Sequence, residues 1–145
     1  MIQRVQTLFL IGVVLTAILL FFIPFQIATN EVDAIQITVL SINSASVTPS
    51  IYFPFLLVLI IIGLSIFTII KFKNRVLQYK LANVLLLLNS VLLAIFFLMR
   101  FYNGTGVVSF YIAAFLPVIG ITFSFLAAHF IKKDEQLVRS ADRIR

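Results

Sequence analysis

YFPFLLVLIIIGLSIFTII, residues Tyr52–Ile70, contains no Asp, Glu, Lys or Arg. A hydrocarbon core of about 30 Å is crossed by roughly 20 apolar residues in a helix, and this run is about that long. The whole chain has the same character, with 62% hydrophobic and only 11% charged residues. Soluble domains average roughly 45–50% apolar and about 25% charged residues. The stretch therefore predicts a transmembrane helix.

Three further uncharged runs lie on either side of this stretch, at Val5–Phe25, Leu81–Met99 and Val107–Ile131. Each is long enough, or nearly long enough, to cross a bilayer. We therefore predict an all-α fold, an integral membrane four-helix bundle. It forms a single membrane domain over residues 1–145, with spans at 5–25, 52–70, 81–99 and 107–131 and a tail at 132–145.

The basic residues outside the spans are unevenly distributed. Of the 11 Lys and Arg residues, all except Arg100 lie before the first span, in segment 71–80 or in the tail. Segment 26–51 carries Glu31 and Asp33 and no basic residue. Basic residues in short loops mark the cytoplasmic side. The pattern predicts cytoplasmic N- and C-termini, with the first connection outside.

The net charge of +6 is a feature that nucleic-acid-binding domains share. Topology and contact with anionic headgroups explain it here, because the basic residues flank apolar spans. We therefore expect the lipid bilayer as a partner and expect no nucleic acid.

Two segments outside the spans have patterns of their own. In the outer loop 26–51, Ile35–Val39 alternates apolar and polar residues, which favours a strand. A hairpin with Ser41–Ser50 and an irregular polar loop both remain open. In the tail, Leu137, Ala141 and Ile144 recur at helical spacing with Val138 beside them. This predicts an amphipathic cytoplasmic helix that extends the fourth span. It would lie on the leaflet, pack under the bundle or dock a partner.

Groups that could carry catalysis are scarce. The chain has no cysteine, and the only ionisable residue inside a span is His129. One imidazole without a second ligand does not form a metal site, and proton relays need several Asp, Glu or His residues. We therefore expect no catalytic, cofactor or metal site, and a protein that is not an enzyme.

The fourth span carries the clearest signal for helix packing. Gly120, Ser124 and Ala128 recur every four residues, and such rows of small residues let helices approach closely. Pro117 removes a backbone donor, so a kink is expected there. In the third span, Asn89 is expected to hydrogen-bond across helices, which is the usual role of Asn in lipid.

Three stretches together resemble a known family. They are Met1–Thr7 (MIQRVQT), Lys73–Gln78 (KNRVLQ) and Lys133–Arg145 (KDEQLVRSADRIR). In these the chain is similar to domain-of-unknown-function family 4293 (DUF4293), and the resemblance extends over essentially the whole length. It implies a small four-span protein of the bacterial inner membrane, of the kind found in Bacteroidota. It implies no catalytic residues.

All three stretches fall on the side that the charges place in the cytoplasm. We therefore predict one charged interaction cluster under the bundle, with the tail folded back against segment 71–80 and the N-terminus. Its expected members are Arg4, Arg75, Glu135, Arg139, Asp142 and Arg143.

Spans without chemistry beside patterned cytoplasmic segments favour a non-enzymatic accessory or interaction subunit of an inner-membrane complex. Other membrane proteins are its expected partners, and a homo-oligomer remains open. A small transporter or channel component is the alternative, and it would need a polar cavity lined by residues such as Asn83, Asn89, Ser90 and Ser124. A membrane enzyme is a third reading, with the cytoplasmic charged cluster as its only candidate site.

Overall fold

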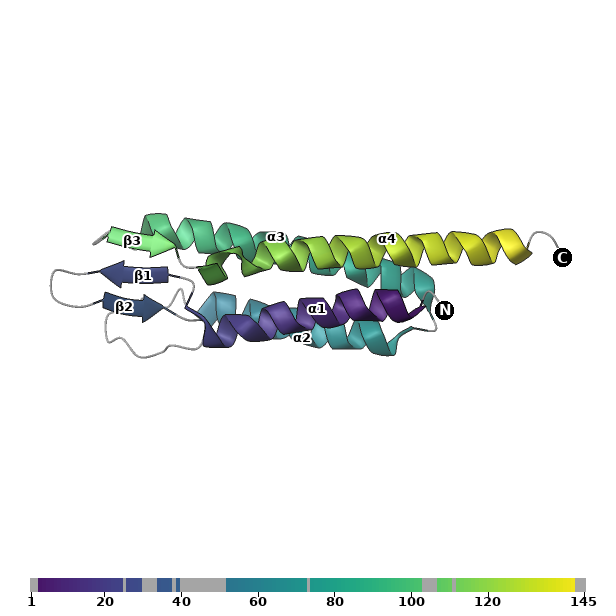
Figure 1. Cartoon of the computed structure of the whole chain (residues 1–145), viewed down its shortest axis with the longest axis horizontal. Coiled ribbons are helices and arrows are strands. Elements are labelled where there is room, and N and C mark those ends of the chain that lie inside the picture. The colour runs from purple at the N-terminus through teal and green to yellow at the C-terminus, as the bar shows by residue number, and fades with distance from the viewer. Residues whose placement is uncertain are drawn as a thin grey trace.

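Four long helices and a small sheet make up the computed structural model (Figure 1). It describes residues 3–24, 26–29, 34–37, 39, 52–72, 74–102, 107–110 and 112–142. The helices are α1 (Gln3–Phe22), α2 (Tyr52–Ile70), α3 (Arg75–Tyr102) and α4 (Leu116–Asp142), and the 3-10 turn η2 (Ile112–Phe115) leads directly into α4. The strands are β1 (Gln26–Thr29), β2 (Ala34–Ile37) and β3 (Val107–Phe110).

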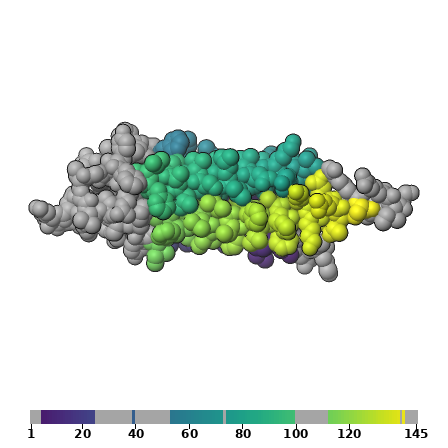
Figure 2. Space-filling model, turned by 90° about the horizontal axis from the view of Figure 1, so that it is seen from above, coloured from purple at the N-terminus to yellow at the C-terminus, as the bar shows by residue number. Residues whose placement is uncertain are grey.

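The predicted membrane bundle is confirmed, since all four helices are long and apolar enough to cross a membrane. The chain is thus a multi-pass membrane protein. Each helix packs against two others: α1 and α3 both contact α2 and α4. Figure 2 shows one face of the bundle, where α3 and α4 run side by side along its length.

The helix ends differ from the predicted span limits for local reasons. α1 ends at Phe22, shortly before Pro24, which has no N–H to continue a helix. α3 begins earlier than residue 81, at Arg75. There the Asn74 side chain accepts a hydrogen bond from the Leu77 N–H over 3.1 Å, the arrangement of a helix N-cap.

The fourth predicted span, 107–131, starts as a strand rather than a helix. β3 occupies Val107–Phe110 and pairs antiparallel with β1, and helical structure begins only at Ile112. A short apolar run with β-branched residues cannot be assigned to helix or strand by apolarity alone. Pairing with β1 decides the outcome here.

Segment 26–51 contains a β-hairpin, and one of its strands, β2, overlaps the predicted strand Ile35–Val39. β2 pairs antiparallel with β1, and the strand order is β2-β1-β3. The strand partner is therefore Gln26–Thr29, immediately after α1, while residues 41–50 lie outside the described part. Val39 follows β2 and is buried in the same core cluster as side chains of the four helices.

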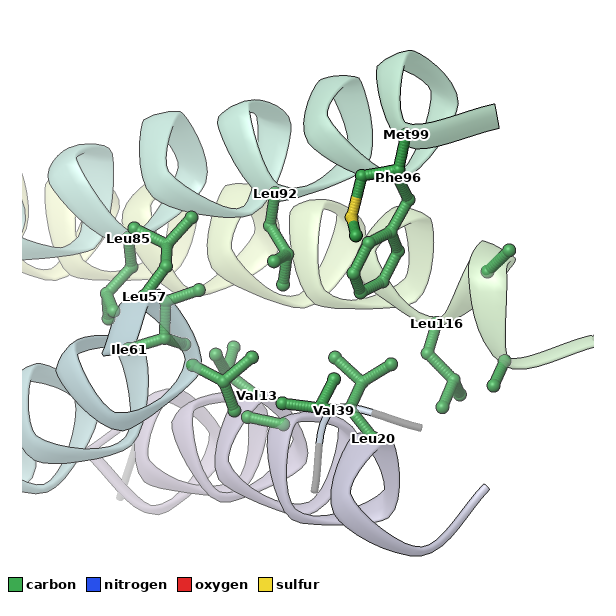
Figure 3. Close-up of a cluster of buried hydrophobic side chains, with 14 of the residues drawn as sticks. Val13, Leu20, Val39, Leu57, Ile61, Leu85, Leu92, Phe96, Met99 and Leu116 are labelled. Carbon is green, nitrogen blue, oxygen red and sulfur yellow. The ribbon is translucent and has the colours of Figure 1, made fainter. Parts of the chain in front are cut away.

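Apolar side chains from all four helices fill the space between them. Figure 3 shows this core, with Val13, Leu57, Leu92 and Leu116 coming from four different helices. Many apolar side chains also point outward, as a lipid-facing surface requires; Leu8 on α1 is 68% exposed and Phe125 on α4 is 59% exposed.

The two ends of the bundle differ in character. The sheet lies at one end, and the start of α1, the connection between α2 and α3, and the last turns of α4 lie at the other (Figure 1). We call the second the charged end. Among the described residues it carries Lys71, Arg75, Lys80, Lys132, Lys133, Asp134 and Glu135.

Candidate functional site

An ion pair joins two helices at the charged end. Asn74 caps α3. Arg75, the first residue of α3, lies beside α4. Arg75 Nη1 lies 3.0 Å from Asp134 Oδ2 and also donates to the Asp134 carbonyl oxygen over 3.2 Å. The Asp134 side chain is 13% exposed and that of Arg75 28%. The contact fixes the part of α4 that follows the lysine pair.

A second contact joins α1 to α4 one helical turn earlier on α4. Gln6 is buried, and its Nε2 donates to the Phe130 carbonyl oxygen over 3.2 Å. One turn further along α1, the Phe9 ring stacks on Phe130, with centroids 5.5 Å apart and planes 10° from parallel. Polar side chains at this end thus bond between helices that are far apart in the sequence.

These contacts border a cavity of about 420 Å³. Its walls combine apolar side chains from α1, α2 and the following turn with amides and the ion pair. The lining residues are Gln6, Thr7, Leu8, Ile11, Ile69, Phe72, Arg75, Gln78 and Asp134. Such a mixture of apolar walls and a few convergent polar groups is typical of small-molecule sites.

A basic surface hollow of about 440 Å³ lies on α4. It is lined by His129, Lys132, Lys133 and Gln136, whose spacing places them on one helical face. The His129 ring centroid lies 6.5 Å from that of Phe125 and 5.8 Å from that of Phe130. The imidazole therefore lies against aromatic neighbours of its own helix.

The predicted charged cluster is described only in part. Arg75 contacts the tail portion of α4, but its partner is Asp134, which the predicted set does not contain. Glu135 is half-buried. The side chains of Arg4, Arg139 and Asp142, and all of Arg143, lie outside the described residues, so the full cluster stays a prediction.

Gln6, Gln78 and Asp134 were not predicted as site residues. Gln6 and Gln78 lie in two of the stretches that resemble the family, but apart from that resemblance they are only polar residues at the start of apolar helices. Asp134 lies beside Glu135 and Arg139 in the tail, and only the register between α3 and α4 shows that it faces Arg75.

The residues predicted for helix packing lie mainly on the inner face of α4. Gly120, Ser124 and Ala128 are buried there. A Cβ added at Gly120 would overlap the Asn89 side chain, approaching its Cγ to 3.0 Å. α3 and α4 are therefore so close at this level that only glycine fits opposite Asn89.

Two expectations for these residues need correction. The Asn89 amide donates to Leu85 in its own helix over 2.9 Å, rather than across helices, because the i−4 carbonyl is the nearest acceptor. Pro117 is the second residue of α4, directly after η2. Its missing N–H therefore falls in the first turn of the helix, where backbone N–H groups have no partner within the helix. Pro117 thus lies at the start of α4 and does not interrupt the middle of the helix.

Polar side chains in the middle of the bundle bond to carbonyl groups of their own helices. Ser65 and Ser124 are buried and donate to the carbonyls of Ile61 and Gly120, over 2.7 Å and 2.8 Å. Asn83 and Ser90 are exposed on the outer face of α3. The residues that a transport cavity would need thus do not converge on a common space.

The model of a family described as a domain of unknown function (DUF4293) matches residues 2–144. Neither the curated proteins nor the solved structures contain a match to the chain.

Proposed function

The chain belongs to the DUF4293 family, and we propose that it is a non-enzymatic interaction subunit of a complex in the bacterial inner membrane. Both termini and the connection between α2 and α3 face the cytoplasm in this proposal. The basic residues support this orientation, because those described at the charged end would all lie on the cytoplasmic side.

The observation that carries the proposal is the continuation of α4 past the ends of the other helices at the charged end (Figure 1). Its 27 residues correspond to about 40 Å at 1.5 Å per residue, which exceeds a hydrocarbon core of about 30 Å. Lys132 and Lys133 are exposed and suit the headgroup level. Leu137 and Val138 follow and are 49% and 42% exposed, so they present apolar surface past that level.

The partner is a protein whose cytoplasmic surface has a groove with an apolar floor and an acidic rim. Leu137 and Val138 would enter the floor as the anchors of a helix lying in a groove, and Lys132 and Lys133 would meet the rim. The Arg75–Asp134 ion pair supports this role, because a helix held in position loses less conformational freedom on binding.

The transporter alternative has less support. It requires polar side chains that line a shared path, whereas Ser124 and Asn89 bond to their own helices and Ser90 is exposed. These bonds favour packing as the role of the polar groups in the spans.

Co-purification from native membranes tests the proposal. A tagged chain should retain a membrane partner at fixed stoichiometry, and Leu137→Asp or Val138→Asp should abolish retention by introducing a charge into the apolar floor. Ser140→Asp is the matched control, since it adds the same charge at another exposed position of α4 that does not line the basic hollow. The proposal would be refuted if Leu137→Asp and Val138→Asp both retained the partner, or if no stoichiometric partner were found.

A further inference from the structure

Gln78, near the start of α3, is a buried polar residue at the charged end. Its side chain is 3% exposed and lines the 420 Å³ cavity, yet its amide has no hydrogen-bond partner among the described residues. A buried amide without a partner bears the whole cost of its desolvation, so such groups are normally satisfied by protein, water or ligand. The amide is therefore available to a polar group that enters the cavity.

The cavity has an apolar side that faces the membrane. Leu8 and Phe72, 68% and 50% exposed, line it together with Ile11 and Ile69. The lining also includes polar groups, namely Gln6, Gln78 and the ion pair. A molecule that matches both kinds of lining has a polar head and an apolar body. Since the cavity lies at the end of the spans, the head of a bilayer lipid is at the right depth.

The charges in the cavity select among lipid headgroups. Arg75 uses Nη1 for its bonds to Asp134, and a guanidinium has five N–H donors in all. The Asp134 contact uses one carboxylate oxygen, Oδ2. A phosphate can thus approach the guanidinium while an ammonium approaches the carboxylate. A paired cation and anion match a headgroup that carries both charges better than a purely anionic one.

We propose that this cavity binds one phosphatidylethanolamine molecule from the cytoplasmic leaflet. Arg75 binds the phosphate, Asp134 accepts from the primary ammonium, and the Gln78 amide donates to a phosphate or ester oxygen. The acyl chains follow the outward apolar side chains of α1 and α2. Phosphatidylcholine is disfavoured, because its quaternary ammonium has no N–H to donate to Asp134. A volume of about 420 Å³ lies in the usual range of ligand sites, roughly 300–1,000 Å³.

Native mass spectrometry of the full chain tests this proposal. The protein is released from vesicles that contain equal amounts of phosphatidylethanolamine, phosphatidylglycerol and phosphatidylcholine. We expect one phosphatidylethanolamine adduct. Gln78→Leu should lower the association constant of this lipid about tenfold, the factor that corresponds to one lost hydrogen bond. Asn83→Leu is the control, because its amide is exposed on the same helix and bonds to Tyr79.

A second variant keeps the test decisive if Gln78→Leu folds poorly. Leu8→Trp should obstruct the apolar entrance while leaving the core intact, since Leu8 faces outward, and it should also lower the adduct. Equal adducts of all three lipids, an adduct unchanged in both cavity variants, or an equal loss in Asn83→Leu would each overturn the proposal. The proposal would also be overturned if inorganic phosphate alone stabilised the protein as strongly as the lipid does.

Discussion

The middle of the bundle and its charged end use polar side chains in opposite ways. In the middle, buried Ser65, Asn89 and Ser124 each donate to a carbonyl one turn earlier in the same helix. At the charged end, Gln6 bonds across 124 residues to Phe130, and Arg75 bonds across 59 residues to Asp134.

This difference separates two tasks. Polar groups satisfied within one helix leave no unpaired donor in the hydrocarbon region, where unpaired groups are costly. They do not join different helices, which approach closely through small residues such as Gly120. Polar groups that bond between helices fix a specific arrangement, and those described here lie at the charged end. The charged end is thus the part suited to recognition.

The largest expected effect concerns which end faces the cytoplasm. The chain has no cysteine, so a single introduced cysteine is a clean reporter. Thr29→Cys, at the sheet end, should react with a membrane-impermeant maleimide in intact cells, and Asn74→Cys should react only after permeabilisation. The reverse labelling pattern would place the charged end outside and remove the basis for a cytoplasmic partner.

Packing in the middle of the bundle gives the next effect. Gly120→Ala should destabilise the folded state by about 1–3 kcal/mol, because the new methyl group overpacks against Asn89. Gly63→Ala is the control, since a Cβ there meets nothing within 4 Å. Reversible unfolding in mixed micelles measures both. In the double variant with Asn89→Ala, the loss should be smaller than the sum of the single losses; strict additivity would show that the two residues do not compete for space.

Loss of the contact between α1 and α4 should be smaller. Gln6→Leu removes one hydrogen bond to Phe130 and should cost about 1 kcal/mol in the same unfolding measurement. The carbonyl left behind has its own helical donor, which limits the loss. Stability equal to that of the unmodified chain would mean that the bond does not help hold α1 against α4.

The ion pair should contribute least, since Arg75 is partly exposed. A double-mutant cycle with Arg75→Ala and Asp134→Ala should give a coupling of about 0.2–1 kcal/mol. The coupling should decrease as salt is raised, because ions screen partly exposed charges. A coupling that is large and independent of salt would indicate a fully desolvated pair, contrary to the observed exposure.

The sequence predicts the spans well because long uncharged runs have only one stable environment. It also predicts the continuation of α4, because no residue in the tail interrupts a helix. It cannot assign Val107–Phe110, whose state depends on pairing with β1. It also cannot pair Arg75 with Asp134 rather than Glu135 or Asp142, because adjacent positions on a helix differ by about 100° and only the packed register selects one of them.

Photocrosslinking from two exposed positions on α4 tests the central claim most directly. Phe125 faces outward in the middle of the bundle and Val138 faces outward beyond the charged end. With a photoreactive amino acid at each position in native membranes, we predict a discrete protein adduct of defined mass from position 138 and only lipid adducts from position 125. A discrete protein adduct from position 125, with none from position 138, would contradict the account.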